Sequence, residues 1–260
     1  MASTQAIRRR IRSARNVAQI TRAVQLVASS RMRRAQERVT ESRPYAQELQ
    51  KLLSRVATQA DQLDEDQPLM DERPVKRALI VLVTPDRGLA GALNSNTTRR
   101  AGELARELRA KYSDVSLEIS FLAIGRKGRD FLTRNRQHIL AEFTQLGDQP
   151  KPADVRAIAR TITDAYIEGQ IDLAMLVYPK FVSMIAQTPT VTQLLPVQPP
   201  EGAADTQGAT PEYIFEPDVT SIFAELLPRY VETLIYQPLL ETVASFYSAQ
   251  MIAMKNATDS

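Results

Sequence analysis

The sequence predicts an α/β protein in which a Rossmann-like body with a mainly parallel sheet is inserted between two long terminal helices. Three observations support this prediction. The first 43 residues contain no Pro and no Gly, and they repeat small or apolar residues at coiled-coil spacing. From residue 75, apolar runs of strand length alternate with helical stretches. The chain closes on another long helical stretch, residues 219–260.

The first helix has a narrow seam of small and apolar residues. The seam consists of Ile7, Ile11, Ala14, Ala18, Thr21, Gln25, Ala28, Met32, Ala35 and Val39. A second apolar strip beside it consists of Val17, Ile20, Val24 and Val27. Pro44 is expected to stop or bend the helix, which resumes over residues 45–60. A helix of about 40 residues is roughly 60 Å long, so it needs a second helix and an outside partner to cover it.

Charge separates this helix from the rest of the chain. Residues 1–43 contain eleven Arg, no Lys and two acidic residues, a formal charge of +9, whereas the remaining residues carry −6. Basic arms of this kind bind polyanions or acidic protein surfaces. A solvated helix face would have the same composition. The use of Arg without Lys favours a partner that offers carboxylates, because guanidinium is weakly hydrated and binds carboxylate in a bidentate way.

The central segment has the pattern of a three-layer α/β unit. Residues 77–84 (RALIVLVT) form a continuous apolar run, as in a parallel strand buried on both faces. Further strands are expected over residues 115–124, 139–143 and 171–178, with an antiparallel return over 181–195. Helices are expected over residues 94–111, 127–136 and 152–168. Strands that alternate with helices in this way predict right-handed crossovers and a parallel sheet.

The two helical ends are expected to pair with each other. On the last helix, residues at helical spacing could meet the first seam: Leu240, Val243, Ala244, Tyr247, Met251 and Met254. The alternative is that each helix packs separately on the body. The resulting division is an N-terminal helix (1–60), an acidic linker (61–74), the α/β body (75–210), and a foot with the C-terminal helix (211–260). Within the body, residues 196–211 are expected to form a loop.

The sequence contains no recognisable active site. There is no Cys, which excludes a disulfide framework and a thiolate metal site. No stretch approaches the roughly 18 apolar residues of a membrane span. The one histidine, His138, has no partner suggested by the sequence and is expected at the surface or half buried. We therefore predict a non-catalytic chain with no cofactor and no metal.

The turn after the first predicted strand lies where a Rossmann protein binds phosphate. Its Gly88-x-x-Gly91 spacing lacks the full dinucleotide pattern, and Asp86 places a negative charge there. We interpret the segment as a tight turn in which Asn94 or Ser95 caps the following helix.

Several blocks resemble the gamma subunit of F-type ATP synthases, the central-stalk rotor. Residues 7–13 (IRRRIRS) and 16–24 (NVAQITRAV) are similar to its opening. Further blocks follow in the order of the family: residues 42–45 (SRPY), 84–94 (TPDRGLAGALN), 213–217 (YIFEP), 227–232 (LPRYVE) and 254–259 (MKNATD). The resemblance covers essentially the whole chain.

The resemblance implies a rotor that transmits torque between a membrane c-ring and a ring of alpha and beta subunits, which holds the ATP chemistry. It implies that the body lies against an epsilon-type subunit and that the coupling ion is a proton or sodium. The contacts to the catalytic ring would be made by Arg8, Arg9, Arg10, Arg12, Gln19, Ile20, Thr21, Arg22, Ala23, Val24, Lys255, Asn256 and Thr258. The foot that meets the c-ring would contain Tyr213, Phe215 and Glu216. The expected location is the cytoplasmic side of a bacterial inner membrane, peripheral and without nucleic acid.

Three features depart from the family pattern. Val24 replaces the usual Met, and Pro238 lies where a helix former is expected, at a cost of roughly 3 kcal/mol or a kink. Family members also continue beyond the block at residues 254–259, so residues 3–14 are expected to lack an intramolecular partner. Two other functions remain alternatives: a nucleic-acid-binding protein that uses the Arg helix, and a dinucleotide-dependent enzyme that binds at residues 88–91.

Overall fold

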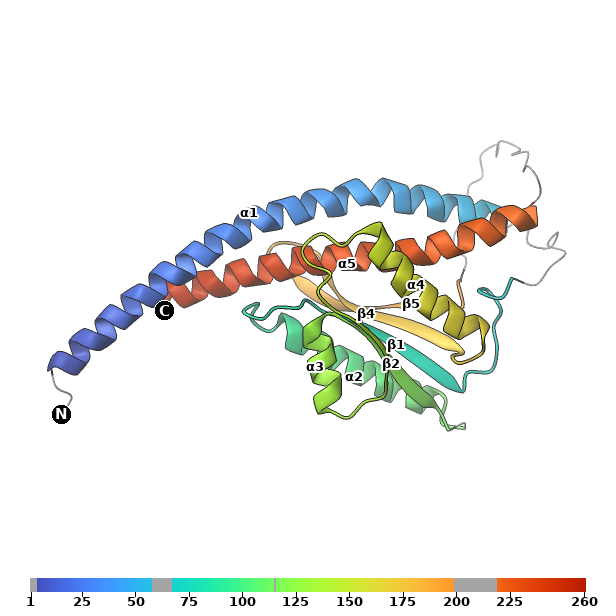
Figure 1. Ribbon diagram of the computed structural model, residues 1–260, viewed down its shortest axis with the longest axis horizontal. Helices are drawn as coiled ribbons and strands as arrows, with labels where there is room; N and C mark the ends of the chain where they lie inside the picture. Colours follow the sequence, from blue (N-terminus) through green and yellow to red (C-terminus); the bar gives the residue numbers. More distant parts are fainter. Residues whose placement is uncertain (1–3, 58–66, 115, 199–218) are drawn as a thin grey trace.

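A computed structural model describes residues 4–57, 67–114, 116–198 and 219–260 of the chain. Two long curved helices lie side by side, and an α/β body packs against one side of them (Figure 1). The elements follow in the order α1 (Thr4–Ala57), β1 (Arg77–Val83), α2 (Leu93–Lys111), β2 (Glu118–Ile124), α3 (Arg126–Arg134), β3 (Ile139–Phe143), α4 (Pro152–Ile167), β4 (Leu173–Phe181), β5 (Gln187–Leu195) and α5 (Val219–Asp259).

The body contains one mixed sheet with the strand order β3-β2-β1-β4-β5. The strands β3, β2, β1 and β4 are parallel, and β5 returns antiparallel to β4. This arrangement confirms the predicted mainly parallel sheet and the antiparallel return. It also brings the carboxyl ends of the parallel strands to one edge of the sheet, which we call the carboxyl edge.

The central strand β1 is buried on both faces, as its continuous apolar run predicts. Leu79 and Val81 belong to a core with α4, α5 and the end of α1, whereas Ile80 and Leu82 belong to a second core beneath α2 and α3. Alternate side chains of a strand point to opposite faces, so a strand covered on both sides needs apolar residues at every position.

The two terminal helices pair in opposite directions, which confirms the predicted antiparallel coiled coil (Figure 1). On α1 the seam is buried from Thr21 onward, where its buried members include Ala28, Met32, Ala35 and Val39. On α5, Leu240, Ala244, Tyr247 and Met254 are buried, and Val243 and Met251 are half buried. Small side chains such as Ala28 and Ala244 let the two helices approach closely.

The prolines inside the two long helices do not end them. α1 runs through Pro44, which is exposed, and α5 runs through Pro228 and Pro238. Of the stop or bend expected at Pro44, the stop is therefore wrong, because the helix continues to Ala57. Pro238 is buried, and its carbonyl oxygen accepts a hydrogen bond from the Thr242 hydroxyl (2.7 Å). The packing of α5 against α1 and β4 holds the helix together despite the missing backbone donor.

The expected cap of α2 is also wrong. α2 begins at Leu93, after Ala92, and no side chain caps it. The Leu93 N–H already bonds to the Ala90 carbonyl (3.2 Å), so the helix starts earlier than a cap at Asn94 or Ser95 would require. The Ser95 hydroxyl instead donates to the Ala92 carbonyl (3.0 Å).

Parts of the predicted connections lie outside the described residues. These parts are residues 58–66 of the first helix end and linker, and residues 199–211 of the loop before α5.

Candidate protein-interaction site

The N-terminal part of α1 extends past the end of α5. Figure 1 shows the C-terminus of the chain beside the N-terminal third of α1, with the first turns of α1 projecting beyond it. Ile7, Ile11 and Ala14 are exposed there, although they continue the buried seam. This agrees with the expectation that the first turns lack an intramolecular partner in this chain. We call residues 4–27 of α1 the arm, which comprises these projecting turns and the turns beside the last residues of α5.

At the base of the arm, two predicted site residues from opposite ends of the chain meet. The hydroxyl oxygens of Thr21 and Thr258 are 2.6 Å apart, and either hydroxyl can be the donor. Each hydroxyl also lies within hydrogen-bond distance of a carbonyl of its own helix, that of Ala18 for Thr21 (3.1 Å) and that of Met254 for Thr258 (2.8 Å), so the hydroxyl that accepts in the pair can donate its own proton there. Thr21 is buried despite its polarity because this contact satisfies its hydroxyl.

The other predicted contact residues lie on the surface around this junction. Exposed residues are Arg8, Arg9, Arg10, Arg12, Gln19, Ile20, Arg22, Lys255 and Asn256, and Val24 is half buried. Within the described part of the chain, no carboxylate lies within ion-pair distance of the arginines at positions 8, 9, 10 and 12. Tyr213, Phe215 and Glu216 of the predicted foot lie outside the described residues.

The arm also exposes large apolar side chains. Ile20 is 64% exposed, and Val17, Leu26 and Val27 are each more than half exposed. The second apolar strip of the sequence, apart from Val24, is therefore uncovered rather than packed on the body. An uncovered apolar surface edged with guanidinium groups is typical of a protein-binding surface.

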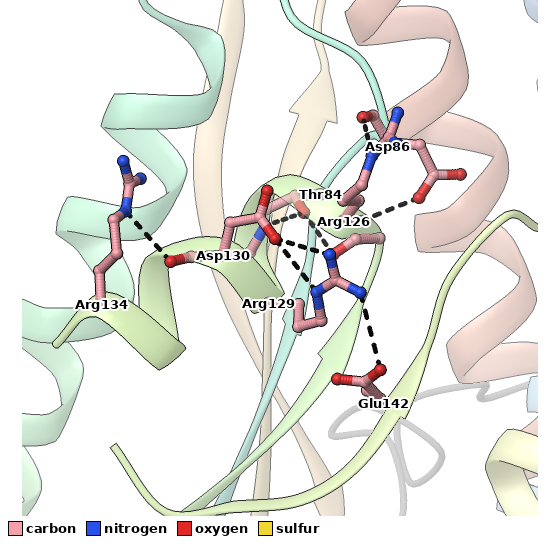
Figure 2. Close-up of polar contacts among 9 residues, drawn as sticks. Thr84, Asp86, Arg126, Arg129, Asp130, Arg134 and Glu142 are labelled. Atoms are coloured by element: carbon pink, nitrogen blue, oxygen red, sulfur yellow. Dashed lines mark hydrogen bonds and ion pairs between the residues drawn. The ribbon is translucent and has the colours of Figure 1, made fainter. Parts of the chain in front are cut away.

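At the carboxyl edge of the sheet, the turn after β1 is bonded to the start of α3. The Asp86 carboxylate accepts the backbone N–H group of Arg126 (2.8 Å) (Figure 2). It also accepts the N–H group of Gln145 (3.1 Å), and the Thr84 hydroxyl accepts that of Gly128 (2.7 Å). Asp86 and Thr84 therefore have structural bonds in this turn.

Figure 2 also shows a cluster of charged side chains on α3. Arg129 pairs with Asp130 (2.8 Å) and Glu142 (3.7 Å). The hydrogen bond from Arg129 lowers the pKa of the Asp130 carboxyl. These groups lie at the surface and stabilise the contact between α3 and β3.

Three other features of the described residues concern the one histidine, possible metal ligands and membrane spans. His138 is exposed, within the range that was expected. Among the described residues, His, Asp and Glu form no group of three that could hold a metal ion. In the same part of the chain, no helix is long and apolar enough to cross a bilayer.

Comparison with known proteins identifies the family. The family profile described as ATP synthase matches residues 3–260. The ATP synthase gamma chain of Roseiflexus castenholzii is 43% identical over 260 residues, and that of Desulfitobacterium hafniense is 44% identical over 259 residues. The chain belongs to the ATP synthase gamma family. It spans 87% of the length of each of these two relatives.

Solved structures share the fold. The chain is similar to one in the central stalk and c-ring of the mitochondrial ATP synthase of Tetrahymena thermophila, with a TM-score of 0.67, 23% identity, and coverage of 92% of this chain and 99% of that one. A chain in the Euglena gracilis mitochondrial ATP synthase gives a TM-score of 0.51 at 16% identity, covering 89% and 84%. As a gamma-family member the chain is a non-catalytic central-stalk subunit, which excludes the nucleic-acid-binding and dinucleotide-enzyme alternatives as its main function.

Proposed function

We propose that the arm is the part of the rotor held by the alpha and beta subunits of the catalytic ring, and that the chain turns inside them as a shaft. The observation that carries this proposal is the exposed apolar strip of the arm, where Val17, Ile20 and Val27 are each more than half exposed beside Arg side chains. A shaft in a protein sleeve needs such a surface, because a helix of this length would otherwise expose its apolar strip to water.

Two kinds of contact would act at the arm. Ile20 and Val27 would bury apolar area against the sleeve, while Arg8, Arg9 and Arg10 would meet acidic residues of the ring. Exposed ion pairs contribute about 0–1 kcal/mol each, so charge alone cannot hold the shaft. The hydrogen bond between Thr21 and Thr258 joins α1 and α5 at the point where the ring subunits would begin to contact both helices.

The opposite end of the coiled coil would face the membrane part of the complex. There the foot with Tyr213, Phe215 and Glu216 would meet the c-ring, and the body would lie against the epsilon-type subunit. The chain would then be attached to the cytoplasmic face of a bacterial inner membrane only through the complex. The complex would couple the passage of protons or sodium ions across the membrane to ATP synthesis.

Charge removal on the arm tests this proposal. In the quadruple variant R8Q/R9Q/R10Q/R12Q, four contacts of about 0.5 kcal/mol each amount to about 2 kcal/mol, or roughly a thirtyfold weaker association with the ring subunits. The measurement is a binding titration of the full chain against the purified ring subunits, followed by coupled ATP synthesis in the reconstituted complex.

A matched control removes four arginines from α2 instead: R99Q/R100Q/R106Q/R109Q. This variant changes the net charge by the same amount but leaves the arm intact. We expect it to bind the ring as the unmodified chain does. Equal binding and equal ATP synthesis in the two quadruple variants would show that the arm arginines make no specific contact.

A further inference from the structure

Asp148, in the loop between β3 and α4, joins the body to α1 by hydrogen bonds. Arg31 of α1 donates from Nη1 to Asp148 Oδ2 at 2.9 Å. Arg38, two turns further along α1, donates from Nη1 to the Asp148 backbone carbonyl at 3.3 Å. Arg87, in the turn after β1, approaches Asp148 Oδ1 to 3.9 Å. Three guanidinium groups from two different parts of the chain therefore converge on one residue.

The same arginine also contacts the second helix of the coiled coil. Arg31 Nη1 donates to the Tyr247 hydroxyl of α5 at 3.0 Å, and its guanidinium carbon lies 5.7 Å from the centre of the Tyr247 ring. Burial and the neighbouring Asp148 carboxylate raise the pKa of Tyr247, so this phenol keeps its proton. Arg31 thus joins α1, α5 and the body at a single point.

The apolar contacts below this junction do not by themselves define an angle. Ala28 and Met32 of α1 pack with Ala90, Phe246 and Tyr247 in a small separate core. Hydrogen bonds fix the body on α5 as well: the Phe181 N–H donates to the Glu241 carboxylate (3.2 Å), and the Ser245 hydroxyl donates to the Pro179 carbonyl (2.9 Å). Hydrogen bonds between guanidinium and carboxylate are directional and charge-assisted, and here they cross from the shaft to the body. Arg33, on the same helix, pairs instead with Glu37 of α1 itself.

We propose that Asp148 is a positioning residue for torque transmission: together with Arg31 it fixes the rotational position of the α/β body on the helical shaft. Torque that enters through the body would then reach the arm without slip between the two parts. This inference rests on the central-stalk function and adds to it the residue that couples the body to the shaft.

The test compares D148A, R31A and the double variant R31A/D148A in the reconstituted complex. R33A is the matched control, since it removes the same charge from the same helix but an ion pair within α1. The readouts are the rate of ATP hydrolysis and the number of ions pumped per ATP hydrolysed. We expect both single variants to hydrolyse ATP and to pump at least twofold fewer ions per ATP. The double variant should be no worse than either single one, because both remove the same contact.

The possible outcomes separate this inference from the central-stalk function itself. A pumping ratio in D148A equal to that of the unmodified chain overturns the role of Asp148. An equal decrease in R33A also overturns it, because the effect would then follow charge and not position. If D148A does not assemble, D148N keeps the side-chain size but removes the carboxylate charge that pairs with Arg31, and an unchanged ratio in D148N overturns the proposal in the same way. If the unmodified chain itself restores no pumping, the central-stalk function fails instead.

Discussion

A pair of valines on α1 provides a sharp test of where the shaft is covered by its own chain. Val39 is 1% exposed and packs with Ala35, Phe181, Leu240 and Ala244, whereas Val27 is 52% exposed on the arm. Each Val→Ala change removes two methyl groups' worth of apolar surface at an interior helix position. The gain in helix propensity, a few tenths of a kcal/mol, is the same at both sites and cancels in the comparison.

The magnitude follows from burial. Two carbons at about 0.8 kcal/mol each amount to about 1.6 kcal/mol for the fully buried Val39, and about half of that for Val27. A residual cavity adds to the cost at Val39 only. V39A should therefore destabilise the full chain by at least about 1 kcal/mol more than V27A does.

Urea unfolding of the full chain, followed by circular dichroism at the helix band, measures this difference. With a slope of about 2.5 kcal/mol per M, the midpoint of V39A should fall about 0.4 M below that of V27A. Equal midpoints would refute the reasoning, because they would mean that Val27 is covered as well as Val39 in the isolated chain.

Three further predictions concern the body and its contact with α5. Burial raises the pKa of Glu241, so the stability linked to its proton is fully present below the unfolded pKa of about 4.3 and is lost as pH rises through the folded pKa. The melting temperature should therefore fall over this pH range, and E241Q should flatten the fall. An unchanged pH profile in E241Q would contradict this reasoning. Burial opposes ionisation of Asp172, but Arg77 and two backbone N–H groups lower its pKa, so the stability that the ionised carboxylate contributes is lost as pH falls through the folded pKa. D172A should lower the free energy of unfolding in urea by about 3 kcal/mol, and D172N should lower it clearly less. Gly125 has φ +91°, and a Cβ there would lie 1.8 Å from the Thr84 carbonyl oxygen, so G125A should prevent folding. Gly147 has φ +74° but lies in open space, so G147A should lower the free energy of unfolding by only about 1–2 kcal/mol. Comparable soluble yields of the two variants would contradict the steric argument.

The sequence predicted the architecture well because its patterns depend on local geometry. The uninterrupted apolar run of β1 required cover on both faces, and the structure shows Leu79 and Ile80 fully buried in opposite cores. The seam of α1 followed from spacing alone, and so did its match to Ala244 and Tyr247 of α5. The wrong predictions concerned helix ends, which depend on backbone hydrogen bonds that no residue pattern specifies. α2 begins at Leu93 because the preceding turn sets its first hydrogen bond.

The candidate site divides in the same way. The arginines and apolar residues of the arm were visible in the sequence because charge and hydropathy are properties of single residues. The exposure of Leu26 and Val27 beside the paired part of α1 was not visible, since it depends on which face of the helix α5 covers. The meeting of Thr21 with Thr258, 237 residues apart, was not predicted, because the family resemblance assigned both residues only to contact with the catalytic ring.

By itself, the sequence determined that this chain has two long helices, a parallel sheet between them and a strongly basic first helix, because periodicity and composition are encoded residue by residue. The tertiary structure alone decided which residues of the seam on α1 pack against α5. It also decided that Arg31 lies between Asp148 and Tyr247, which are 117 and 216 positions away in the chain. Such contacts depend on the relative placement of distant elements, and no local pattern specifies that placement.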